Sequence, residues 1–175
     1  METNVRLYSL NYDEVKTYVW AAVFVGCNLL LPQLFHLIPN GGVIFAPLSF
    51  VILAGAFKFG WKPALLAALA SPLVNHAITG MPAWQVMPLM TLKLAILAIA
   101  AGLAASRLSR RASHASALAL LASLLVVVLV AEAVGALVEL ALTGGIAATI
   151  ADLTVGWPGL LLQVFGTWLI LTRLK

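Results

Sequence analysis

A lysine lies inside an apolar stretch of this sequence, at a position where a charge is costly. Lys93 comes about one and a half helical turns into the apolar run that begins near residue 88. On insertion scales a lysine at the middle of a membrane helix costs about 2.5–3.5 kcal/mol. Two acids, Glu132 and Glu139, lie seven residues apart in a later apolar run and therefore share one helical face. These charges predict either a polar pocket for a small molecule or a structural ion pair, such as Lys93 with Glu132, that fixes helix packing.

Other polar and aromatic side chains occur near the ends of the neighbouring apolar runs, so we expect them at a similar level of the protein. They are Asn75, His76, Trp84, Gln85, Trp157 and Gln163. The amides would hydrogen-bond a ligand, and the indole rings would cover its apolar or aromatic face. Structural roles stay open: His76 can cap a helix end, and the tryptophans can anchor the chain at the membrane interface. Gln163 can bond a neighbouring helix, Glu139 can be solvated, and Lys93 can extend to the interface.

No combination of residues indicates catalysis. The sequence has no His-Glu-x-x-His zinc motif, no Gly-x-Ser-x-Gly elbow and no phosphate-binding P-loop. Its histidines lack the spacing of metal ligands, and Cys27 has no second cysteine. We therefore predict that the chain is not an enzyme, holds no metal and needs no cofactor. Without a nucleotide-binding segment, it cannot by itself couple transport to ATP.

The composition is that of an integral membrane protein. Of the 175 residues, 63% are hydrophobic and 9% are charged, with a mean hydropathy of +1.07, whereas soluble domains carry about 25% charged residues. The net charge of +4 does not suggest nucleic acid, because the basic residues lie in short loops and at the ends, where they orient a membrane protein. We predict a cytoplasmic arm at 1–17 and a single membrane domain at 18–175, whose first run is a retained helix.

Six apolar segments predict an all-α protein with six transmembrane helices. They cover residues 18–38, 43–57, 63–78, 88–106, 115–142 and 156–171. The second contains Pro47 and is short, so we expect it to be tilted, broken or partly re-entrant, and residues 146–155 are expected to form a connection. With six crossings, nine of the ten lysines and arginines fall on one side, and the loops on the other side hold none. The positive-inside rule then places both termini in the cytoplasm.

A series of short motifs occurs in a fixed order along these segments. They are Ala54-Gly55, Ser71-Pro72-Leu73, Thr79-Gly80-Met81-Pro82, Met87-Pro88-Leu89-Met90 and Ala101-Gly102. A later run, Gly-Trp-Pro-Gly-Leu-Leu-Leu-Gln at 156–163, is similar to a Gly-x-Pro-Gly-x-x-x-Gln stretch. Together these motifs resemble the substrate-binding S component of energy-coupling factor (ECF) vitamin transporters, over most of residues 20–172. The chain departs from that family at Lys93, where members often carry glutamate.

The resemblance implies a six-helix bundle with both termini cytoplasmic and a pocket near the outer face, closed by outer loops. It also implies a complex with a transmembrane coupling protein and two cytoplasmic ATPase subunits. Ala22 and Gly26 match an Ala-x-x-x-Ala pattern that contacts the coupling protein in the family. From their spacing alone, these two small residues would pack within the bundle as easily as against a partner.

The resulting hypothesis is a substrate-capture subunit that binds a vitamin or related micronutrient at the outer face of a bacterial or archaeal cell (inner) membrane. The expected binding residues are Lys93, Glu132, Gln163, Asn75, Trp84, Gln85, Trp157, Glu139 and His76. The alternative is a non-transporting six-helix scaffold or assembly factor, which would need no pocket.

Overall fold

The computed structural model describes residues 9–35, 37–111 and 116–173, and this part of the chain is helical without any strand. The helices are α1 (Val15–Phe35), α2 (Gly41–Phe45), α3 (Pro47–Phe59), α4 (Trp61–Thr79), α5 (Met87–Arg111), α6 (Ala117–Thr143), α7 (Ile146–Leu161) and α8 (Thr167–Arg173). A five-residue π-helical turn, η1 (Leu162–Gly166), joins α7 to α8 without a loop.

Four helices are long and apolar enough to cross a membrane, and they indicate a membrane-embedded protein. Within the described ranges these stretches are Val15–Phe35, Met87–Ser109, Ala117–Thr143 and Thr154–Arg173. α3 has only 13 residues, which at 1.5 Å per residue is about 20 Å, short of a hydrocarbon layer of about 30 Å.

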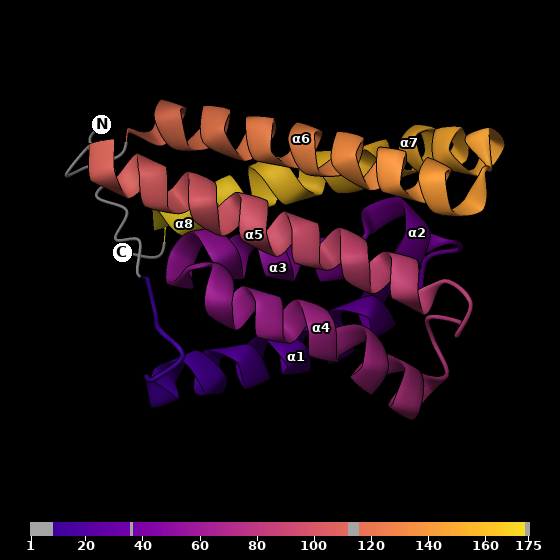
Figure 1. Ribbon diagram of the computed structural model, residues 1–175, viewed down its shortest axis with the longest axis horizontal. Helices are drawn as coiled ribbons and strands as arrows, with labels where there is room; N and C mark the ends of the chain where they lie inside the picture. Colours follow the sequence, from indigo (N-terminus) through magenta and orange to yellow (C-terminus); the bar gives the residue numbers. More distant parts are fainter. Residues whose placement is uncertain (1–8, 36, 112–115, 174–175) are drawn as a thin grey trace.

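The helices run side by side, with the start of α1 and the end of α8 at the same end of the bundle (Figure 1). We call this the basic end, because the helix ends gathered there carry Lys16, Lys58, Lys62, Arg107 and Arg173. Two side chains tie segments together there. The Lys62 ammonium donates to the Asn11 side-chain oxygen at 2.5 Å, and the Trp168 indole donates to the Ala117 carbonyl at 2.8 Å. The opposite end, which we call the loop end, holds α2, the turn at 80–86 and the break between α6 and α7 (Figure 1).

Small side chains let α3, α4 and α5 pack closely in the half nearer the basic end. Six alanines are fully buried: Ala56, Ala64, Ala67, Ala68, Ala98 and Ala101. At Gly102 of α5 the backbone of Trp61 comes so close that an added Cβ would lie 2.5 Å from its nitrogen. Gly55 likewise faces the ring of Phe24. Close approach through glycine and alanine is the usual way for helices to associate in lipid.

One expectation for the form of the predicted segments is confirmed and one is wrong. The second segment is broken, as expected, at Ala46, which has a left-handed φ of 42° and separates α2 from Pro47 at the start of α3. Pro47 takes the first position of α3, which proline favours because its missing N–H and fixed φ cost nothing there. The expected connection at 146–155 is wrong, because those residues form the first turns of α7.

Candidate functional site

A cavity of about 990 Å³ extends from the loop end towards the middle of the bundle. Its wall comes from the loops and from most of the helices. The chemically important lining residues are Asn40, Ser49, Asn75, Thr79, Lys93, Glu132, Glu139 and Gln163. Because Gln33, Asn40 and Ala83 of this wall are exposed, the cavity reaches the surface at the loop end.

The cavity exists because α3 occupies only the basic half of the bundle. At Ala46 the chain leaves the line of α3, and α2 packs instead beside α7 (Figure 1). Gly159 of α7 permits this, since an added Cβ there would lie 2.7 Å from the Ile44 carbonyl oxygen. The first turn of α3, including Pro47 and Ser49, therefore lines the cavity instead of continuing through it.

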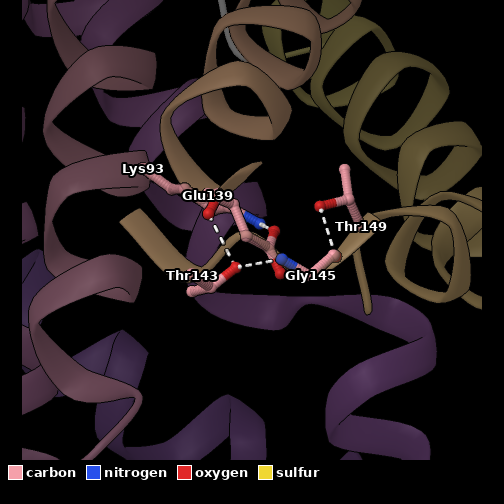
Figure 2. Close-up of polar contacts among 5 residues, drawn as sticks. All are labelled: Lys93, Glu139, Thr143, Gly145 and Thr149. Atoms are coloured by element: carbon pink, nitrogen blue, oxygen red, sulfur yellow. Dashed lines mark hydrogen bonds and ion pairs between the residues drawn. The ribbon is translucent and has the colours of Figure 1, made fainter. Parts of the chain in front are cut away.

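Lys93 of α5 reaches across the cavity wall to α6. Its ammonium lies 2.5 Å from a carboxylate oxygen of Glu139, and the two side chains are 26% and 8% exposed. Figure 2 shows the two side chains approaching from neighbouring helices. The lysine stem crosses α6 at Gly135, where an added Cβ would lie 3.3 Å from Lys93 Cγ. The partner of Lys93 in this ion pair is thus Glu139, and this carboxylate is buried instead of being solvated at the surface.

The turn after Glu139 is braced by its own hydrogen bonds. The Thr143 hydroxyl donates to the Glu139 carbonyl at 2.8 Å and accepts from the Gly145 N–H at 3.2 Å. The Thr149 hydroxyl donates to the Gly145 carbonyl at 3.3 Å (Figure 2). Gly144 closes α6 with a φ of 65°, which is why a glycine ends the helix there. These bonds hold the end of α6, and so Glu139, in a fixed position.

Glu132 lies three residues before Gly135 on α6, and Glu139 lies four residues after it. Both glutamates line the cavity, as expected for positions on one helical face. The lysine stem therefore passes between two acids. Among the described residues, no group of three or more His, Cys, Asp or Glu side chains is placed to hold a metal ion.

Gln163 lies in the π-helical turn η1, and its side chain is only 1% exposed. Its amide oxygen Oε1 has no hydrogen-bond partner, although the residue lines the cavity. Because α7 begins at Ile146, Gln163 lies about 25 Å along the helix, deeper than the sequence suggested. Isolated π-helical turns often mark functional sites, because they redirect a side chain out of the helical repeat.

Asn75 lines the cavity but is also part of a buried link between α1 and α4. Its amide donates to the carbonyls of Asn28, at 3.0 Å, and Ser71, at 2.8 Å. The Asn28 amide in turn donates to the Ser71 hydroxyl at 2.9 Å. The nitrogen of Asn75 is therefore already engaged within the protein.

Four of the nine expected binding residues lie outside the described wall of the cavity. They are His76, Trp84, Gln85 and Trp157. His76 Nδ1 lies 2.8 Å from the Pro82 carbonyl oxygen, and its ring packs 5.7 Å from that of Trp84, so it braces the turn after α4. Trp84 and Trp157 are 64% and 58% exposed, as interfacial anchors would be.

The wall of the cavity also includes residues whose types alone offered no chemical reason to choose them. The loop at 39–42 and the turn at 81–83 both line the mouth of the cavity, and Ser49 lines its interior. Proline and glycine in these loops were a signal for turns only. The packing of α2 against α7 brings the loop at 39–42 to the wall of the cavity that also holds the charged side chains.

Ala22 and Gly26 lie on the outer face of α1. Ala22 is exposed, and an added Cβ at Gly26 would have no neighbouring atom within 4 Å. Large apolar side chains on the same helix are exposed as well, including Val19, Val23 and Leu30. The spacing left two possibilities for Ala22 and Gly26. The structure does not pack them within this chain's own bundle.

Comparisons of the chain with protein-family models, with curated proteins and with solved structures find no match.

Proposed function

We propose that the chain is the substrate-capture subunit of an ECF-type importer, binding a vitamin or related micronutrient. The observation that supports this most is the cavity of about 990 Å³ inside an apolar bundle, with the Lys93–Glu139 pair, Glu132 and the buried Gln163 in its wall. Its volume lies in the range of small-molecule sites, about 300–1,000 Å³. Charged and polar groups in an apolar bundle are costly, and substrate binding is the usual reason for keeping them.

In this proposal the chain crosses a bacterial or archaeal cell membrane six times, with both termini in the cytoplasm. The support comes from the basic end, where the described ends of the chain and five described basic residues gather. The positive-inside rule assigns that end to the cytoplasm and the mouth of the cavity to the outside. The short α3 fits this arrangement. It fills the bundle only in the half nearer the basic end, and the cavity occupies the outer half.

The outer face of α1 would be the contact for a transmembrane coupling protein, which would join the chain to two cytoplasmic ATPase subunits. The small residues Ala22 and Gly26 leave space on this face for another helix. This partnership rests on the resemblance to S components, and the exposed apolar side chains of α1 are consistent with it.

The test is to identify small molecules that co-purify with the detergent-solubilised protein, by mass spectrometry after denaturation. Ala83→Trp places a large ring at the exposed mouth of the cavity and should abolish the co-purified ligand. Ala77→Trp is the matched control, because Ala77 is exposed on α4 outside the described wall of the cavity.

The proposal predicts a ligand in the wild-type protein and in Ala77→Trp but none in Ala83→Trp. A well-folded wild-type protein that carries no small molecule, and binds none from a panel of vitamins, would favour the scaffold alternative. A ligand retained equally by both variants would place the binding site elsewhere.

A further inference from the structure

Resting on the proposed function, we propose a chemical class for the ligand: it carries a protonated nitrogen, which Glu132 and the amide oxygen of Gln163 recognise. Two independent observations point to this class. The first is the charge of the cavity wall, and the second is the buried acceptor at Gln163.

The ionisable residues described in the cavity wall leave a surplus of negative charge. They are one lysine, Lys93, and two glutamates, Glu132 and Glu139. One ammonium balances the charge of one carboxylate, whichever of the two glutamates it donates its hydrogen bonds to. No other lysine or arginine occurs between Lys62 and Arg107, or between Arg111 and Arg173, to supply a second positive charge at this level. An anionic ligand would add a further negative charge to a partly desolvated site, where repulsion is stronger than in bulk water.

The ends of the helices do not reverse this balance. The first turn of α3, at Pro47 to Ser49, brings a partial positive charge of at most about half a unit to the cavity. The end of α4 at Thr79, which also lines the cavity, brings a partial negative charge of similar size. The whole-charge surplus from the two glutamates therefore decides the sign.

Gln163 supplies a specific acceptor for an N–H group. Its side chain is 1% exposed, and Oε1 has no partner within the protein. Buried carbonyl oxygens are nearly always hydrogen-bonded, so a donor from the cavity is expected. The Lys93 ammonium is paired with Glu139, nearer the loop end. A protonated nitrogen on the ligand would donate to the amide oxygen of Gln163 and would also balance the surplus negative charge.

The experiment compares three probes that share one pyridine ring: pyridoxamine, pyridoxine and 4-pyridoxate. They carry an aminomethyl, a hydroxymethyl and a carboxylate group at the same ring position. Equilibrium dialysis against the full-length protein in detergent gives a dissociation constant for each. We expect pyridoxamine to bind about tenfold more tightly than pyridoxine, with 4-pyridoxate the weakest, because opposite charges attract strongly in a partly desolvated site.

Two variants test whether Glu132 and Gln163 cause the preference for pyridoxamine. Glu132→Gln removes the surplus charge and should bring pyridoxamine and pyridoxine to within about twofold of each other. Gln163→Leu removes the acceptor and should weaken pyridoxamine binding about fivefold. Gln85→Leu is the matched control, because Gln85 is exposed and lies outside the described wall. It should leave all three constants unchanged.

The outcomes separate the ligand class from the proposed function. Binding of 4-pyridoxate as tight as that of pyridoxamine, or a preference that survives in Glu132→Gln, overturns the class and leaves substrate capture standing. If none of the probes binds, the molecule that co-purifies with the protein tests the ligand class. A co-purified molecule without a basic nitrogen overturns that class. No probe bound and no co-purified molecule overturns both proposals.

Discussion

The two halves of the helical bundle are built from different side chains. In the half nearer the basic end, buried alanines such as Ala67 and Ala98, with glycine at 102, bring α3, α4 and α5 into close contact. In the half nearer the loop end, the same helices separate around a cavity with an ion pair in its wall. The boundary between the halves is Ala46, where α2 leaves the line of α3.

This difference shows how a small membrane protein can separate stability from binding. In lipid, helices associate through close packing of small residues, and the packed half supplies that contact. The open half keeps groups that cost folding free energy, including the amide oxygen of Gln163 without a partner. A bulky substitution in the packed half should therefore lower stability, whereas removing the acceptor without a partner in the open half should raise stability and weaken ligand binding.

The largest effect is expected in the packed half. Gly102→Leu should destabilise the protein by about 3 kcal/mol, because the new side chain meets the backbone of Trp61. Denaturant unfolding of the detergent-solubilised protein, followed by tryptophan fluorescence, measures this loss. Gly26→Leu is the control, since space is open at Gly26, and it should change stability by less than about 0.5 kcal/mol. Equal losses in the two variants would contradict the division into halves.

Breaking the ion pair should have the next largest effect. Glu139→Gln removes the carboxylate oxygen that lies 2.5 Å from the Lys93 ammonium, and we expect a loss of about 2 kcal/mol, below the usual range for fully buried pairs because Lys93 is 26% exposed. The double variant Lys93→Met with Glu139→Leu should recover most of this loss, as buried pairs replaced by apolar residues often do. Unfolding by the same denaturant gives both values. A double variant less stable than Glu139→Gln would mean that the pair itself stabilises the bundle.

A smaller effect of opposite sign is expected at Gln163. Gln163→Leu removes a buried acceptor that has no partner and should stabilise the ligand-free protein by about 1 kcal/mol. Its melting temperature in detergent should rise, while Gln85→Leu should leave it unchanged because Gln85 is exposed. A fall in the melting temperature would show that the amide of Gln163 has a structural role.

The smallest effect is expected for the two exposed tryptophans. Trp84→Phe and Trp157→Phe should each change ligand affinity by less than about twofold, because both rings lie outside the described wall of the cavity. Isothermal titration with the identified ligand measures this directly. A tenfold loss in either variant would mean that the ring moves over the bound ligand.

Much of the fold could be predicted from the sequence. The apolar runs are separated by turns of glycine and proline, and in the residues described all six predicted segments are mostly helical, with a break at Ala46 in the second. The extension of α7 back to Ile146 was missed because the double glycine at 144–145 and the charge of Asp152 suggested a loop. The direction of α2 was beyond prediction, since it depends on a contact with the distant Gly159.

The candidate site was predictable where a charge or amide lies in an apolar run. Lys93, Glu132, Glu139, Asn75 and Gln163 all line the cavity for this reason. The residues in and beside the turns were less predictable, because their sequence does not say whether a side chain faces the cavity or the surroundings. His76, in the last turn of α4, faces the Pro82 carbonyl oxygen of the following turn.

The central claim is that a cavity within the bundle is accessible from the loop end. Ser49 lines this cavity from the first turn of α3, so Ser49→Cys in a Cys27→Ser background places one thiol there. In intact cells, a membrane-impermeant methanethiosulfonate with a trimethylammonium group should modify this thiol rapidly from outside, and bound ligand should block the reaction. An unreactive thiol at this position, in cells where Met81→Cys at the exposed loop is fully modified, would contradict the account.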